Sequence, residues 1–240
     1  LFPISIYWSL RRFNFDPLAC GMGALIASLI GNDFQLWGGF GYASYSFSGF
    51  GLYTQLWGMI FLPIALALGY QTIRTGQGYF WATLLLSVTL MSHLLYGYMA
   101  FVTLGFLAFI PNTDMKSSVQ AIFAHWKRLL LVFGLVVCVT LYFIVPFLLD
   151  QEHFGATAAN TNQELRDSFG FQVVIKNLVK GDLFDFGRFP SISILILGGI
   201  GSCIFYRRDS HYLVPILVFI AWLLLFFGRT TWGSAIDLLP

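Results

Sequence analysis

Hydrophobic and polar positions follow one another along this chain in long blocks. Apolar runs of about 15 to 21 residues alternate with short polar segments. An α-helix needs roughly 20 apolar residues to cross a bilayer, and shorter helices suffice inside a bundle. The pattern predicts an all-α fold, a polytopic transmembrane helical bundle of about seven short spans that follow an initial half span (1–10): 18–31, 53–73, 79–92, 95–110, 129–149, 191–206 and 213–227.

One uncharged stretch is too long for a single span. No Asp, Glu, Lys or Arg occurs from Thr75 to Thr113. The apolar part, Tyr79 to Ile110, has 32 residues and as one helix would be about 48 Å long. A break at 92–97 predicts a hairpin of two short helices, which returns the chain to the side of Arg74.

Three polar segments connect the predicted spans. An extracytoplasmic loop at 32–52 is rich in Gly and aromatic residues, and a longer one at 150–190 contains a predicted surface helix over 163–180 that ends at Gly181. Residues 114–128 show apolar positions at helical spacing before a Lys-Arg pair, which predicts an amphipathic cytoplasmic connector helix in the lipid headgroups.

The domain organisation is simple, because no internal repeat or low-complexity linker interrupts the chain. We expect residues 1–240 to form a single transmembrane domain. Since Leu1 lies within a helical pattern, without a charged leader or cleavage site, the chain is expected to be an internal fragment. Cys20, Cys138 and Cys203 fall inside predicted spans, where apolar packing is the expected role and neither a disulfide nor a metal site is predicted.

Composition excludes a soluble domain of this size. The chain is 58% hydrophobic and only 10% charged, whereas soluble domains contain about 25% charged residues. Phosphate-cradling loops, Cys/His metal spacings and nucleophile elbows are all missing from the sequence. The acidic long loop argues against nucleic acid as a partner, and the uncharged spans argue against ion-coupled transport.

Charge orients the spans. Of the 13 Lys and Arg residues, eight lie on one predicted face with only three Asp, a net charge of +5, and the other face carries five basic and eight acidic residues, a net charge of −3. Cytoplasmic loops are enriched in Lys and Arg, so the acidic loops are expected outside the cytoplasm. The basic set is Arg11, Arg12, Arg74, Lys116, Lys127, Arg128, Arg207 and Arg208.

Candidate substrate-binding residues lie on the acidic, outer face. His93 and Tyr96 occupy the tip of the hairpin, where the imidazole either is satisfied by a backbone carbonyl or donates to a phosphate or sugar. Asp150 and Glu152 directly follow a span, and are either solvated or act as a base or cation ligand. Arg229 offers bidentate geometry to a phosphate, with snorkelling to lipid headgroups as the alternative.

A second acidic segment, residues 181–190, lies between a glycine and a proline. Asp182, Asp185 and Arg188 are crowded there by phenylalanines. An ion pair between Asp185 and Arg188 that caps the turn into the next span is one interpretation, and substrate contact is the other. The catalytic residues are not identified by these patterns.

Several short motifs occur in a fixed order along nearly all of the chain. Together they resemble the bacterial integral membrane proteins called 6-pyruvoyl-tetrahydropterin synthase-related. The motifs are Phe2-Pro3 with Tyr7-Trp8 and Arg11-Arg12, Gly49-x-Gly51-Leu52-Tyr53-Thr54-Gln55-Leu56 with Pro63, Ser92-His93-Leu94-Leu95-Tyr96-Gly97-Tyr98, Pro146-Phe147-Leu148-Leu149-Asp150, and residues 181–190.

The resemblance implies a multi-pass protein of the bacterial plasma membrane, with its acidic loops outside. It also implies the architecture of GT-C glycosyltransferases, which use a polyprenyl-phosphate sugar at the outer membrane face. Their catalytic carboxylate usually lies in the first outer loop, which would precede Leu1. Pterin chemistry is not implied, because the soluble synthase needs a zinc-binding His cluster and the four His residues here are spread over both faces.

Two classes of function are expected. The preferred one is a glycosyltransferase-like membrane protein that transfers lipid-linked sugar to a glycan or lipid acceptor; no cofactor is predicted, and a divalent cation is compatible with the chemistry. The other is a non-catalytic membrane protein, such as a lipid or polysaccharide transporter or an assembly scaffold.

Overall fold

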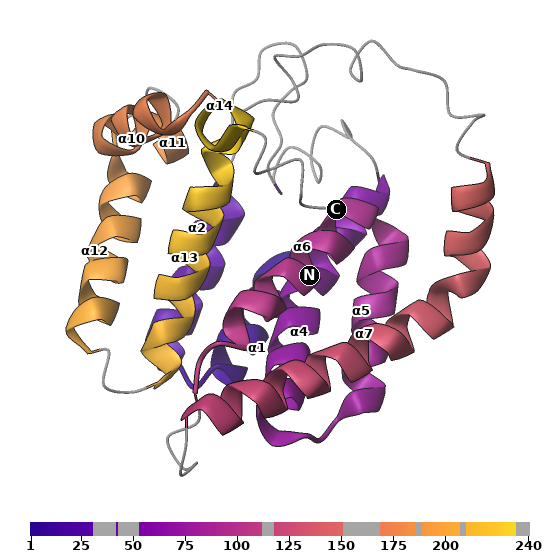
Figure 1. Cartoon of the computed structure of the whole chain (residues 1–240). Coiled ribbons are helices and arrows are strands. Elements are labelled where there is room, and N and C mark those ends of the chain that lie inside the picture. The colour runs from indigo at the N-terminus through magenta and orange to yellow at the C-terminus, as the bar shows by residue number, and fades with distance from the viewer. Residues whose placement is uncertain are drawn as a thin grey trace.

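The computed structural model describes residues 1–30, 42, 53–111, 118–150, 169–185, 189–206 and 210–233, and every regular element in these ranges is a helix (Figure 1). The all-α prediction is therefore confirmed for this part of the chain. The helices are α1 (Phe2–Arg12), α2 (Pro17–Leu29), α4 (Tyr53–Thr75), α5 (Tyr79–Ser92), α6 (Leu94–Leu107), α7 (Ser118–Leu149), α10 (Phe171–Lys180), α11 (Asp182–Asp185), α12 (Ser191–Phe205), η2 (Ser210–Tyr212), α13 (Leu213–Phe226) and α14 (Gly228–Trp232).

Helices occupy each of the seven ranges predicted as spans. Within the described residues, α4 and α7 are long and apolar enough to cross a membrane, and five further apolar helices are shorter. Large apolar side chains on α7 are exposed, for example Leu130 at 63% and Tyr142 at 67%. Exposed apolar surface of this extent is unfavourable in water, which indicates a membrane-associated helical protein.

Successive long helices run in alternating directions, so their termini lie at two ends of the bundle. In Figure 1 the C-terminal ends of α1, α4 and α12 lie at the lower end of the bundle, while α10, α11 and α14 lie at the upper end. We call these the basic end and the acidic end, after Arg11, Arg12 and Arg74 on one side and Asp182 and Asp185 on the other.

The predicted hairpin break is confirmed at His93. This residue has extended backbone angles, φ −157° and ψ 110°, which end α5 at Ser92 and allow α6 to start at Leu94. The two helices approach closely because Gly97 lies against Leu90: a Cβ at residue 97 would be 2.7 Å from the Cα of Leu90. The absence of a side chain at this position permits the contact.

The predicted boundary between the connector and the fifth span is wrong. Residues 118–128 and 129–149 form one helix, α7, and residues 112–117 lie outside the described part. The physical reason is a single buried stripe with spacings of three and four residues that crosses the expected boundary without a change of face. Its members are Ala121, His125, Leu129, Val132, Val136 and Thr140.

The outer surface helix is shorter than predicted. α10 ends as expected at Gly181, which has the left-handed φ of 87° that favours glycine. It begins only at Phe171, because Gly170 has φ 84° and residue 169 is not helical. Residues 163–168 of the predicted helix, and the loop 32–52 apart from Tyr42, lie outside the described residues.

The core lies where α4, α5, α6 and α7 meet. Small residues allow this packing: Ala65 is fully buried on α4, and a Cβ at Gly69 would come within 2.7 Å of Leu104 on α6. α13 joins the core through α6, since the indole Nε1 of Trp222 donates to Thr103 Oγ1 at 3.0 Å. The largest fully buried apolar side chains of this core are Ile73, Leu86, Leu104, Leu107, Ile110, Val132 and Val136.

Candidate functional site

His93 and Tyr96 meet at the turn between α5 and α6. Their ring centroids are 4.6 Å apart, and Gln55 Nε2 on α4 donates to the Tyr96 hydroxyl at 3.3 Å. The pair can lie so close to α4 because residue 58 is glycine: a Cβ there would be 2.5 Å from Tyr96 Cδ2. The helix α4 therefore orients the tyrosine ring, and the tyrosine orients His93.

The imidazole of His93 favours its neutral form. Burial lowers its pKa from the ordinary 6.5, because desolvation penalises the imidazolium. Its Nδ1 atom is buried and has no hydrogen-bond partner among the described residues. A neutral imidazole has one donor and one acceptor nitrogen, so His93 has the chemistry of a hydrogen-bonding contact and not that of a fixed positive charge.

Asp185 has a structural role at the start of α12. Its carboxylate accepts hydrogen bonds from the backbone N–H groups of Ile192 and Ser193, both at 2.9 Å, and from Ser193 Oγ at 2.8 Å. The side chain is 3% exposed. Asp185 thus caps α12 by satisfying donors at its N-terminus, while the predicted ion pair with Arg188 stays a prediction. Its expected partner Arg188 lies outside the described residues.

The remaining candidates do not converge on one point. Asp182 is exposed on α11, and Arg229 is exposed on α14, which packs against α10 through a bond from Phe171 N to Thr231 Oγ1 of 2.8 Å. Asp150 is exposed at the end of α7, and Figure 1 shows this end on the opposite side of the bundle from α10, α11 and α14. Glu152 lies outside the described residues.

An apolar groove opens between α6, α11 and α13, and the hydropathy pattern gave no sign of it. Its volume is about 590 Å³. Asp182 directly precedes the lining residue Leu183 on α11, and Arg229 on α14 follows the lining residue Phe226 by three positions; both are close to the groove in sequence and neither lines it. The lining includes Met99, Leu183, Phe184, Phe219, Trp222 and Leu223.

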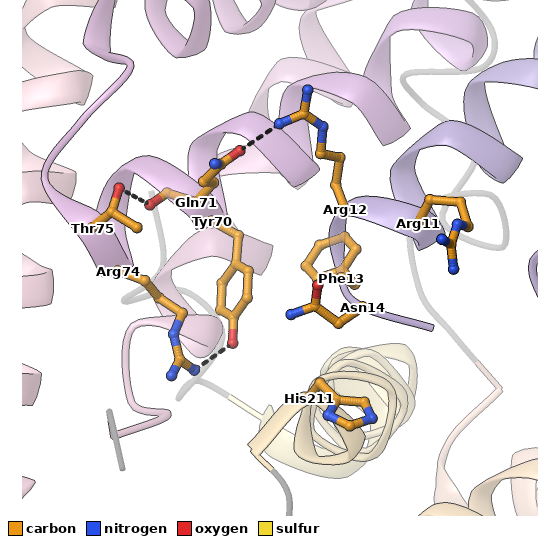
Figure 2. A pocket seen from close by; sticks show the side chains of 9 residues that line it. All are labelled: Arg11, Arg12, Phe13, Asn14, Tyr70, Gln71, Arg74, Thr75 and His211. Atoms are coloured by element: carbon orange, nitrogen blue, oxygen red, sulfur yellow. Dashed lines mark hydrogen bonds between the residues drawn. The ribbon is translucent and has the colours of Figure 1, made fainter. Parts of the chain in front are cut away.

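A second cavity lies at the basic end (Figure 2) and has a volume of about 390 Å³. Arg11, Arg12, Arg74 and His211 line it together with polar and aromatic neighbours. Sequence reasoning used these arginines only as topology signals. Each follows the end of a predicted helix, which signals a common membrane face, whereas nothing in the sequence signals a common cavity.

Comparison with known proteins identifies no relative. No family model, no curated protein and no solved structure matches the chain. The described residues contain no group of three or more His, Cys, Asp or Glu side chains arranged to hold a metal ion.

Proposed function

We propose that this protein is a multi-pass membrane protein of about seven spans that acts on a lipid-linked sugar at its acidic end. The observation that carries the proposal is the apolar groove between α6, α11 and α13, about 590 Å³ in volume. A concave apolar surface with a few polar groups at its edge is the usual form of a site for an amphipathic ligand. The hydrocarbon chain of a polyprenyl phosphate suits this lining.

The edge of the groove offers groups for a phosphosugar. Arg229 on α14 has a guanidinium suited to bidentate contact with a phosphate, and the exposed carboxylate of Asp182 can accept from sugar hydroxyls. With the lipid chain along Phe184 and Leu223, the headgroup would lie beside these two residues. The proposal assigns them to headgroup binding and leaves Asp185 a structural role.

The reaction class comes from the resemblance to the GT-C architecture. Under this proposal the protein transfers sugar from a polyprenyl phosphate to a glycan or lipid acceptor outside the cytoplasm, with inversion at the anomeric carbon. His93 directly precedes α6 and Tyr96 lies in the first turn of this helix, whose Met99 lines the groove. The neutral imidazole can there contact the donor or the acceptor.

The experiment uses the protein in proteoliposomes with radiolabelled polyprenyl-phosphate sugars, with and without Mg²⁺ or Mn²⁺. Leu223→Trp fills the groove. It should reduce sugar consumption about tenfold or more, because the polyprenyl chain of the donor then loses its apolar binding site. The matched control is Ile220→Trp, on the same helix with 47% of the side chain exposed. Equal activity in both variants would refute a role for the groove.

The alternative is a non-catalytic lipid or polysaccharide transporter, or an assembly scaffold. It is favoured by the hydrogen bonds of Asp185, because this buried carboxylate accepts from the backbone of α12 and so is not available to a substrate. Saturable binding of the polyprenyl phosphate that Leu223→Trp abolishes, without consumption of any sugar donor, would support this alternative over glycosyl transfer.

A further inference from the structure

The cavity at the basic end has a strongly positive lining built from three separate segments. Arg11 and Arg12 come from the last turn of α1, Arg74 from the last turn of α4, and His211 from η2 (Figure 2). Among the residues that the structure describes, nine line the cavity and none of these is Asp or Glu. Positive side chains from distant parts of the sequence therefore share one concave surface.

Neutral acceptors orient two of these guanidinium groups. Arg11 Nη1 donates to the backbone oxygen of Phe15 at 2.7 Å, and Arg12 Nη1 donates to Gln71 Oε1 at 3.3 Å. Arg12 also lies over the ring of Trp8, 4.8 Å from its centroid. Such contacts fix a side chain but do not cancel its charge, and a guanidinium has five N–H donors in all. Both groups therefore keep their positive charge at the cavity.

Neutral polar side chains complete the lining. Tyr70, Gln71, Thr75 and Asn14 all contribute to it, and the Tyr70 hydroxyl accepts from Arg74 Nη1 at 2.8 Å. Asn14 has a left-handed φ of 66°, a conformation that asparagine tolerates better than most residues. The cavity thus combines charged forks with hydroxyl and amide groups.

The helix termini alone would disfavour an anion here. α4 ends at this cavity, and the C-terminus of a helix has a partial negative charge. Arg128 on α7 offsets this, because its Nη1 donates to the backbone oxygens of Ile73 at 2.9 Å and Arg74 at 2.7 Å. The last carbonyls of α4 are therefore satisfied by an arginine outside the cavity lining.

We infer that this cavity binds a phosphate group, supplied by an anionic lipid headgroup of the cytoplasmic leaflet or by a soluble phosphate ester. Arginine forks match phosphate oxygens in bidentate geometry. The cavity of about 390 Å³ is also large compared with the roughly 30 Å³ share of a water molecule, so it has room for a group attached to the phosphate. This site is independent of the groove at the acidic end.

The test is calorimetric titration of the full chain in zwitterionic nanodiscs with dihexanoyl phosphatidylglycerol, and in parallel with glycerol 3-phosphate. Arg11→Gln with Arg12→Gln should weaken binding about tenfold or more, since two charge-assisted contacts are lost. The matched control is Lys127→Gln: Lys127 is exposed beside Arg128 at the same end but does not line the cavity. Its affinity should change less than about twofold, as for a screened surface charge.

The two probes separate the two sources of phosphate. Tight binding of the lipid alone identifies a headgroup site, and equal binding of glycerol 3-phosphate identifies a soluble ligand; both outcomes support the inference. If the double Gln variant does not fold, Arg12→Lys is the second test. It keeps the positive charge but loses the paired N–H donors of the guanidinium, and should weaken binding about threefold. Equal weakening by Lys127→Gln, or no saturable binding of either probe, would overturn the inference.

Discussion

Asp185 connects two helices at the acidic end through one buried carboxylate. The hydrogen bonds to Ile192 and Ser193 satisfy donors that the first turn of α12 cannot satisfy by itself. Ser193 Oγ is also within 3.2 Å of the Gly181 backbone oxygen, so the contact includes the residue that ends α10. Because Asp182 lies on the same short helix as Asp185, its position depends on this arrangement.

We predict that Asp185→Ala lowers the free energy of unfolding by about 2 kcal/mol, because it removes a helix cap and leaves buried donors unsatisfied. Thermal unfolding in mild detergent, followed by circular dichroism, measures the change. Asp182→Ala is the matched control on the same short helix, and since Asp182 is exposed its effect should stay within about 0.5 kcal/mol. Similar losses in both variants would contradict the capping role.

The helix pair α5 and α6 depends on the close approach at Gly97. A Cβ there would overlap the Cδ1 atom of Leu90 and lie 2.7 and 2.8 Å from its Cα and Cβ atoms. Because one of these is a backbone atom, a change of side-chain rotamer cannot relieve the overlap. The helices themselves would have to separate, and the turn at His93 would move with them.

Gly97→Ala is therefore expected to destabilise the protein by about 1 to 3 kcal/mol through overpacking. The same helix supplies the control: a Cβ at Gly105 would lie 3.6 Å from Trp126 Cη2, an ordinary contact. Gly105→Ala should be neutral or stabilise α6 by up to about 1 kcal/mol, as alanine favours helix. The measurement is the midpoint of thermal unfolding of the Gly97→Ala and Gly105→Ala variants, each compared with the unmodified protein. A neutral Gly97→Ala variant would show that α5 and α6 do not pack as described.

At the scale of the molecule, the distribution of charge between the two ends predicts the orientation in a membrane. Single cysteines test it after Cys20, Cys138 and Cys203 are replaced by alanine. Asp182→Cys at the acidic end should react with a membrane-impermeant maleimide in intact cells, whereas Gln77→Cys, between α4 and α5, should be labelled to less than about a tenth of that level. Both positions are exposed, so detergent-permeabilised cells should label both. Equal labelling of intact cells would exclude the proposed crossing.

Much of the fold was predictable from the sequence because its causes are local. Apolar runs identified the helices, the uncharged stretch required a break that the structure has at His93, and Gly181 ended α10. The continuity of α7 was not predictable. The hydropathy changes between residues 128 and 129, which suggested two elements, whereas the buried face of the helix continues unchanged across this point. Likewise, the sequence could not decide between a capping and a substrate-binding role for Asp185.

By itself, the sequence determined an all-helical, membrane-type chain with its basic and acidic segments on alternate connections, since hydropathy and charge are properties of consecutive residues. Only the tertiary structure decided which of these residues share a cavity. The groove joins α6 to α11 and α13, and the basic cavity joins residues 11–14 to 70–75 and His211. Such convergence depends on how helices far apart in the chain pack, and one-dimensional patterns do not encode that packing.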